Sequence, residues 1–237
     1  MACFSAFIFI IFLKTMPRKK EFDVDLVLDK AMNAFWNRGY EATSLNDLLD
    51  CMQIQRASLY NAFGDKRTLF LETLRRYEVN RQAQISSSAK LHSPRQAIFR
   101  LFQDIVTAVL ENKAREGCFL VNTALELSPH DEKVAKFVGR AFSKREMFFR
   151  KMIEKGQASG EISQIVAPAA TARALLSLCI GLRVLSRSRP EKLLLESIAK
   201  QVDALLPSGD EAVPTLDSAD ASSSQWPMTS SRPVQTP

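Results

Sequence analysis

Apolar residues recur at spacings of three and four along most of the chain, which is the period of an amphipathic helix. Runs in which apolar and polar residues alternate, as they do in a half-buried strand, are hard to find. We therefore predict an all-α protein of about nine helices. With 237 residues, 46% of them hydrophobic, the chain can bury a substantial core in one or two domains.

Three short amphipathic segments follow one another between residues 25 and 63. The first ends at Gly39, which suits the left-handed C′ position after a helix. The second starts after Thr43, a good N-cap, and the third covers residues 55–63. Two short helices joined by a tight turn form a helix-turn-helix, which we place in a domain of residues 17–67. The residues expected to pack these helices together are apolar and helically spaced: Leu26, Val27, Ala31, Ala34, Phe35, Leu45, Leu48, Leu49, Ile54, Leu59 and Phe63.

The junction after the third segment has a glycine, an acid and a base in succession. Gly64 suits the end of one helix, and Asp65 suits the N-cap of the next. Lys66 then lies in the first helical turn, where a cation opposes the helix macrodipole. A phosphate outside the protein would be attracted by this ammonium and by the free N–H groups of the helix start. We interpret Lys66 as a residue kept for an anionic partner.

The outward face of the third segment carries small, polar and aromatic residues: Arg56, Ala57, Ser58, Tyr60 and Asn61. Such groups suit contacts with base edges, thymine methyl groups and phosphates in a DNA major groove. The solvated face of a purely structural helix has a similar composition. The helical pattern alone therefore leaves both interpretations open.

Two motifs carry a resemblance to a known family. The element F-x-x-x-G-Y-x-x-T-S runs from Phe35 to Ser44, and LYNAFGDK occupies residues 59–66. In order and spacing these residues resemble the N-terminal domain of TetR-family transcriptional regulators. The resemblance implies a homodimer on a palindromic operator of double-stranded DNA, with phosphate contacts from Thr43, Tyr60 and Lys66. The full set of predicted DNA-binding residues is Thr43, Ser44, Arg56, Ala57, Ser58, Tyr60, Asn61 and Lys66.

Two residues depart from the pattern of many family members. Gln53 stands where they have glycine in the turn before the recognition helix, and Gln55 stands where they have serine or threonine as its N-cap. A non-glycine residue in a left-handed turn costs on the order of 1 kcal/mol, and a weaker cap costs a similar amount. We expect neither departure to abolish the motif.

The remaining pattern predicts six longer or shorter helices in a domain of residues 68–206. Their expected bounds are 68–87, 94–113, 119–127, 131–159, 167–187 and 190–206. The resemblance makes this the ligand-binding and dimerisation domain, whose last two helices pair with those of a second subunit. A core helix shows the same spacing, so the dimer prediction depends on the resemblance. The residues expected at the dimer contact are Ala174, Leu175, Leu178, Gly181, Leu182, Leu185, Leu194, Ile198, Val202 and Leu205.

Residues 115–131 resemble a signature found among TetR-like regulators, GC-L-x-N-x-A-x-E-L. Asn122 and Glu126 are four residues apart, hence on one helical face, in an otherwise apolar segment. We interpret them as polar anchors of a pocket for a small-molecule effector. The alternative is that they cap neighbouring helices or pair with basic residues. The apolar residues predicted to line this pocket are Phe102, Val106, Phe119, Leu120, Phe148 and Phe149.

Cys118 is predicted at a helix N-terminus close to Arg115, where positive charge favours the thiolate. It would then sense electrophiles or oxidants, while a buried thiol that fills space is the alternative. The four cysteines form no C-x-x-C pair, and the chain has only two histidines. We expect no disulfide framework, no metal site and no cofactor, in keeping with a reducing cytoplasm.

Charge and the two chain ends add little to this picture. The net charge is +6, but residues 17–70 carry equal numbers of acidic and basic side chains, so charge alone does not locate a DNA-binding surface. The apolar part of residues 1–16 is too short to span a bilayer and lacks signal-peptide features. We expect Met16 to be the natural start, with a membrane tether as the alternative. Residues 207–237 are predicted to be a disordered tail.

These patterns predict a cytoplasmic, homodimeric, DNA-binding transcriptional repressor released by a small molecule or by an electrophile or redox signal. No catalytic residue is predicted, because the chain has no G-x-S-x-G, P-loop, G-x-G-x-x-G or H-E-x-x-H motif. The alternative is a helical enzyme or small-molecule-binding protein without a role on DNA.

Overall fold

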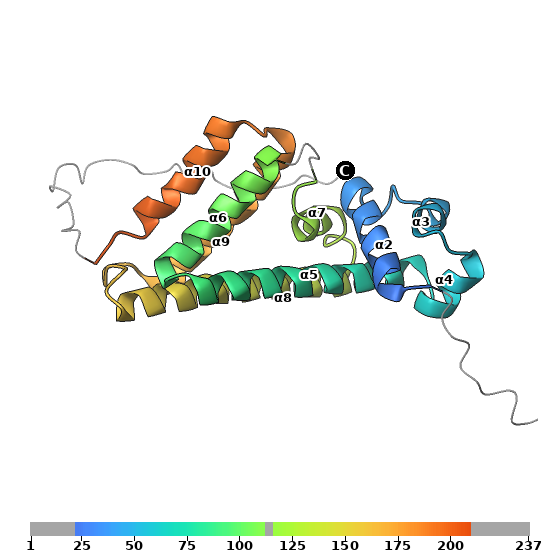
Figure 1. Ribbon diagram of the computed structural model, residues 1–237, viewed down its shortest axis with the longest axis horizontal. Helices are drawn as coiled ribbons and strands as arrows, with labels where there is room; N and C mark the ends of the chain where they lie inside the picture. The colour runs from blue at the N-terminus through green and yellow to red at the C-terminus, as the bar shows by residue number, and fades with distance from the viewer. Residues whose placement is uncertain (1–21, 112–115, 210–237) are drawn as a thin grey trace, which may run out of the picture.

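Nine helices and no strand make up residues 22–111 and 116–209, the residues that the computed structural model describes (Figure 1). The all-α prediction is confirmed, and so is the number of helices for this part of the chain. The predicted leader, residues 1–16, and nearly all of the predicted tail, residues 207–237, lie outside the described residues.

The helix-turn-helix consists of three short helices: α2 (Val24–Arg38), α3 (Leu45–Met52) and α4 (Arg56–Phe63). One prediction here is wrong, because Ser44 and not Thr43 is the N-cap of α3. Asp47 lies three residues after Ser44, so each side chain accepts a hydrogen bond from the other residue's amide. Thr43 is instead fully buried, and its hydroxyl donates to the Gly39 carbonyl at 2.6 Å.

The turn between α3 and α4 shows the two departures noted in the sequence. Gln53 adopts the left-handed conformation, with φ 58° and ψ 43°, and is the only non-glycine residue with a positive φ in the described ranges. Gln55 is the N-cap of α4, but its side chain makes no capping hydrogen bond. The turn therefore keeps the geometry of the motif with residues that stabilise it poorly.

Two long helices extend away from this unit: α5 (Lys66–Leu91) and α8 (Glu132–Ala158). Asp65 caps α5 by accepting the Thr68 amide at 2.6 Å, and Figure 1 shows α5 running from the helix-turn-helix toward the opposite end of the molecule. The helix begins earlier and ends later than the predicted 68–87. Asp131, the N-cap of α8, forms an ion pair with Arg67 at 2.6 Å, so the starts of the two helices are tied together.

The remaining helices differ from their predicted bounds by two residues at most: α6 (Pro94–Glu111), α7 (Phe119–Glu126), α9 (Pro168–Ser188) and α10 (Lys192–Leu205). Helix α9 packs on α8, and α6 packs on α8 and α10. In Figure 1 the helices α6, α9 and α10 form a lobe at the end of the molecule away from the helix-turn-helix, and α7 lies between the two.

Two hydrophobic clusters hold the molecule together. One contains the buried residues of α6, α9, α10 and the second half of α8. The other contains the buried residues of the helix-turn-helix together with Tyr77 of α5, Phe119 and Leu120 of α7, and Val134 of α8. The core beneath the helix-turn-helix thus includes parts of the chain well beyond residue 67, and α7 belongs to it.

Helix α9 has an apolar surface that the single chain leaves largely uncovered. It is the one described helix with the length and mean hydropathy of a membrane span, 1.4 over 18 residues, yet only 22% of that window is buried. Part of the predicted dimer contact is wrong, because Leu175, Leu182 and Val202 are buried in the core of the single chain. The other predicted contact residues are half-buried: Ala174, Leu178, Gly181, Leu185, Leu194, Ile198 and Leu205.

Candidate nucleic-acid interface and a cysteine-lined cavity

Helix α4 has one buried and one solvent-facing side. Leu59 and Phe63 are buried, whereas Tyr60 is 47% exposed although aromatic side chains usually find cover. The residues predicted to contact DNA from this helix are all exposed or half-buried: Arg56, Ala57, Ser58, Tyr60 and Asn61. The Arg56 guanidinium donates to the Asn46 side chain at 3.1 Å. The exposed side of α4 therefore offers donors, acceptors and a methyl group to a groove.

Lys66 is held beside α4 by an aromatic ring. Its ammonium lies over the ring of Tyr40, 4.3 Å from the centroid. Among the ion pairs of the described residues none includes Lys66. A cation–π contact orients the ammonium without neutralising it, so Lys66 is placed to meet a phosphate.

Thr43 and Ser44, the two residues predicted to contact DNA from the start of α3, both have hydroxyl groups bonded within the protein. Thr43 is buried with its hydroxyl bonded inside the protein, so its side chain has no route to a phosphate in this conformation. Ser44 is exposed, but its hydroxyl donates to the Asp47 carboxylate at 2.6 Å. The candidate interface is therefore concentrated on α4 and the first turn of α5.

The last residue of α7 holds the loop between α2 and α3. The Glu126 carboxylate accepts the amide of Tyr40 at 3.0 Å and that of Glu41 at 2.9 Å. Gly39, with φ +90°, lies so close that a Cβ there would stand 2.9 Å from a Glu126 oxygen. Glu126 is thus not an anchor in a ligand pocket, as predicted, but a cap on a neighbouring segment, which was the alternative.

The loop that precedes α7 is hydrogen-bonded to α2. The indole N–H of Trp36 donates to the Glu116 carbonyl at 3.0 Å, and the Asn122 amide donates to the same oxygen at 2.9 Å. The predicted pocket role of Asn122 is therefore also wrong, because the side chain braces its own loop. Helix α7 is fastened to the helix-turn-helix at both ends.

The apolar residues predicted to share one pocket are divided between the two cores. Phe102, Val106 and Phe149 are buried in the cluster of α6, α8, α9 and α10, with Phe148 packed against it. Phe119 belongs to the cluster of the helix-turn-helix. Helical periodicity placed these residues on inward faces, but it does not distinguish close-packed core from the lining of a ligand pocket.

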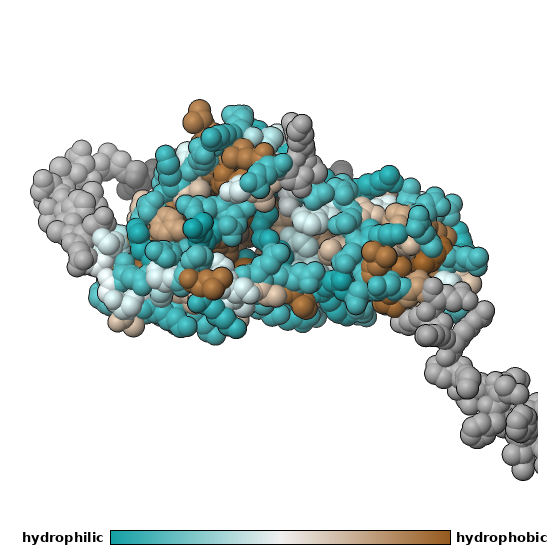
Figure 2. Space-filling view, in the orientation of Figure 1, coloured by the Kyte–Doolittle hydropathy of each residue, from teal (hydrophilic) through white to brown (hydrophobic). Residues whose placement is uncertain are grey.

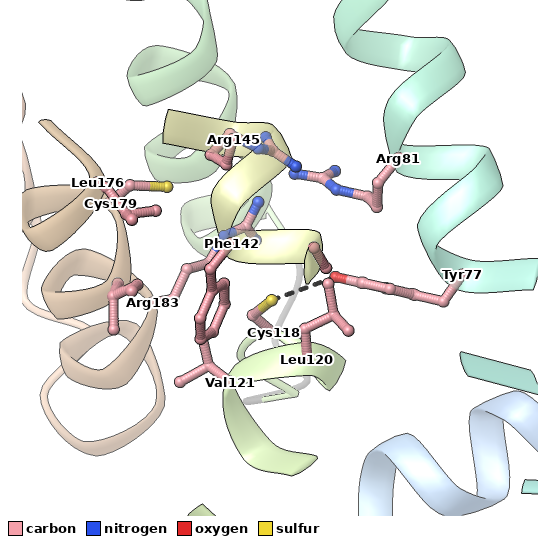
Figure 3. A pocket seen from close by; sticks show the side chains of 12 residues that line it. Tyr77, Arg81, Cys118, Leu120, Val121, Phe142, Arg145, Leu176, Cys179 and Arg183 are labelled. Carbon is pink, nitrogen blue, oxygen red and sulfur yellow. Dashed lines mark hydrogen bonds between the residues drawn. The ribbon is translucent and has the colours of Figure 1, made fainter. Parts of the chain in front are cut away.

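A cavity does occur, around Cys118 (Figure 3). Its volume is about 40 Å³, enough for a few water molecules. Cys118 is the N-cap of α7, and the Tyr77 hydroxyl donates to its sulfur at 3.5 Å. Burial raises the pKa of Tyr77, which keeps it a phenol donor, and burial likewise raises the pKa of Cys179. The cavity-lining residues are Tyr77, Arg81, Cys118, Leu120, Val121, Ala141, Phe142, Arg145, Leu176, Cys179, Ile180 and Arg183.

Sequence reasoning missed most of this lining. Tyr77 and Arg81 are four residues apart on one face of α5, and Arg145 lies at helical spacing from the buried residues Ala141 and Phe149 of α8. A basic residue on the buried face of a helix is a signal that could have identified Arg145. No sequence signal places side chains of α5, α8 and α9 around Cys118, because that proximity arises only in the tertiary structure.

The face of the molecule in Figure 2 is mostly hydrophilic, with apolar residues gathered in separate patches. The exposed large apolar side chains of the described residues include Tyr60 of α4 and Val184 of α9. The first belongs to the candidate DNA surface, and the second belongs to the uncovered face of α9.

The chain matches known sequence families over most of its length. Residues 27–73 match the bacterial regulatory proteins of the tetR family, and residues 94–201 match the tetracyclin repressor-like C-terminal domain. An uncharacterised HTH-type transcriptional regulator of Bacillus subtilis, YezE, is 32% identical over 209 residues, covering 85% of this chain and 100% of the relative.

Two further relatives are informative. The HTH-type transcriptional repressor ComR of Escherichia coli is 34% identical over 63% of this chain and 72% of its own length. The TetR-family regulator CifR, solved as a cysteine mutant complexed with 26-bp operator DNA, is 28% identical with a TM-score of 0.72, covering 80% of this chain and 100% of that one. The chain belongs to the TetR family of transcriptional regulators.

Proposed function

We propose that this regulator is a homodimeric repressor that binds a palindromic operator and leaves it when a small molecule or an electrophile acts at Cys118. The observation that carries the proposal is the solvent-facing polar side of α4 next to an unneutralised Lys66. Operator binding by the CifR relative and the repressor name of ComR support it. A role on DNA would be exercised in the cytoplasm, and family membership favours a regulator over the alternative of a helical enzyme.

Side chains of α4 would read the bases, and Tyr60 and Lys66 would bind phosphates. An exposed phenol can donate to a phosphate oxygen, and the Lys66 ammonium stands at the start of α5, whose free amides also attract anions. Thr43 would make no side-chain contact with DNA, because its hydroxyl is bonded within the protein.

Dimerisation would use the uncovered face of α9, with α10 beside it. Val184 is 40% exposed, and a Cβ added at Gly181 would meet nothing within 4 Å, so a second helix can approach there. A single recognition helix buries too little surface for specific binding, and two helices in successive major grooves provide it.

Helix α7 would transmit the effect of an adduct on Cys118 to the DNA-binding surface. Cys118 begins this eight-residue helix and Glu126 ends it, about 12 Å away at 1.5 Å per residue. Glu126 holds the amide of Tyr40, and the ring of Tyr40 holds the Lys66 ammonium. An adduct on Cys118 that displaces α7 would therefore free the Tyr40 loop and move Lys66 away from its phosphate. Such coupling requires that the adduct is tolerated better in the released state.

The test is fluorescence anisotropy with an operator obtained by selection from random DNA. We expect tight binding to a palindromic site, weakened in Tyr60→Ala and Lys66→Ala. Lys151→Ala, which removes an exposed lysine of α8, is the matched control and should bind like wild type. Selection that returns no palindromic site, with binding no tighter than to random duplex, would contradict the proposal.

A further inference from the structure

Three arginines from three different helices line the cavity beside Cys118. They are Arg81 of α5, Arg145 of α8 and Arg183 of α9. Figure 3 shows the guanidinium groups of Arg81 and Arg145 close together and pointing toward one another. None of the three forms an ion pair with a carboxylate of the described residues, and the hydrogen bond of the Arg81 guanidinium goes to the neutral side chain of Gln84.

This arrangement is electrostatically costly as it stands. Burial and the neighbouring Arg81 lower the pKa of Arg145, which means that its charged form is disfavoured. Glu78 is near enough to Arg145 to favour that charge, but it forms no ion pair with it. One Glu78 oxygen has no hydrogen-bond partner, and burial raises the pKa of this 6%-exposed carboxyl. Glu78 therefore offsets at most one of the three positive charges.

The rest of the lining offers few acceptors to a ligand. The walls are apolar at Leu120, Val121 and Leu176, and the Tyr77 hydroxyl is already a donor to Cys118. A ligand that satisfies the site must therefore be an acceptor with negative charge and a short apolar body. A carboxylate matches the planar fork of a guanidinium, which binds it through two parallel hydrogen bonds.

We infer that the cavity is a binding site for a small organic carboxylate, held by Arg81, Arg145 and Arg183 beside Cys118. Its volume of about 40 Å³ limits the ligand to a short chain. The inference names the effector class of the site in the proposed function and rests on that proposal only for the effect on DNA. Binding itself is a property of the free protein.

The experiment is a titration of the full chain without DNA, at constant ionic strength, followed by calorimetry and by the melting temperature. Propionate is the probe, and propionamide, of nearly the same shape but neutral, is its control. We expect saturable binding and a rising melting temperature with propionate and neither with propionamide. Inorganic phosphate should bind at least about tenfold more weakly, because its shape does not suit apolar walls.

Variants separate a ligand role from a structural one. Arg145→Gln and Arg183→Gln should each weaken propionate at least about tenfold, as expected for a charged hydrogen bond. Arg145→Gln should melt no lower than wild type without ligand, because it removes a desolvated charge that has no ion-pair partner. Arg140→Gln, an exposed arginine of the same helix, should bind propionate normally.

The inference would be overturned by equal effects of propionate and propionamide, by equally tight phosphate binding, or by propionate affinity unchanged in Arg145→Gln. An Arg145→Gln protein that melts lower and loses its dimer would mean that the arginine serves a subunit contact, which also overturns it. Adding operator DNA then separates the two proposals. Propionate that binds without changing operator affinity removes its role as effector and leaves the site, whereas failure to bind leaves repression intact.

Discussion

The α4 surface and the Cys118 cavity both present cationic groups without an acidic partner, but at very different cost. Lys66 is half-buried beside Tyr40, and the face of that ring stabilises the ammonium. Arg145 is half-buried between α5 and α9, and the loss of contact with water there disfavours its charge. A cation that rests on a ring face needs no ligand to be tolerated, whereas a desolvated cation beside other arginines gains far more when an anion binds. The cations of the DNA surface are therefore stable in the free protein, whereas the arginines of the cavity gain most of their electrostatic stability when a ligand binds.

Removing the Glu126 carboxylate should have the largest effect on the link between these two regions. Glu126→Ala deletes two hydrogen bonds from amides of the Tyr40 loop to a charged group. We expect a loss of about 2 kcal/mol in the free energy of unfolding, together with weaker operator binding. Denaturant titration measures the first quantity and anisotropy the second. Leu125→Ala, at an exposed neighbour on α7, is the control. Unchanged operator affinity in Glu126→Ala would separate α7 from the interface.

Lys66→Ala should affect the DNA surface alone. In a dimer it removes two phosphate contacts, so the slope of log affinity against log salt should become shallower by about 2. We expect operator affinity to fall at least about tenfold at moderate salt, with the melting temperature of the free protein little changed. A salt series by anisotropy gives the slope. A slope equal to that of wild type would show that Lys66 does not contact a phosphate.

Gln53→Gly should stabilise the helix-turn-helix without touching either region. Glycine adopts the positive φ of this turn without the penalty of a side chain, so we expect a gain of up to about 1 kcal/mol in the free energy of unfolding. Thermal and denaturant unfolding provide the measurement. A destabilised variant would mean that contacts of the Gln53 side chain, such as its hydrogen bond from Lys30 at 3.4 Å, outweigh the backbone penalty.

The smallest expected effect concerns pH and the ion pair that ties α5 to α8. The hydrogen bond from Arg67 lowers the pKa of Asp131 in the folded protein. The stability from this pair is therefore fully present above the ordinary aspartate pKa, and it is lost as pH falls through the lowered folded value. Below about pH 4, Asp131→Asn should lose less stability than wild type. Identical acid denaturation profiles would rule out this contribution.

The helix-turn-helix and the cavity also differ in how far the sequence alone predicts them. Gly39, Gly64 and Asp65 end or cap helices within a few residues of their own position, so spacing and capping rules predicted the helix-turn-helix closely. The wrong N-cap prediction at Thr43 missed by one residue. Asp47, three residues after Ser44, completes the capping box that identifies Ser44 as the N-cap.

The cavity depends instead on contacts between distant segments. Phe102 and Phe149 were recognised as apolar, but only packing shows that they stack on one another in a core, with ring centroids 6.0 Å apart. Glu126 has the same sequence context whether it faces a ligand or the amide of Tyr40, and it bonds across 86 positions of sequence. Helical periodicity does not predict hydrogen-bond partners that are so far apart in the sequence.

The most direct test of the account is operator affinity before and after alkylation of Cys118 alone. In a Cys3→Ser, Cys51→Ser background, maleimide should modify Cys118, while Cys179 stays protected by burial. Mass spectrometry confirms a single adduct, and anisotropy then measures binding. We predict at least about tenfold weaker operator binding after alkylation, and no change upon the same treatment of Cys118→Ser. A fully alkylated Cys118 with unchanged operator affinity would contradict the proposed link from the cavity through α7 to DNA.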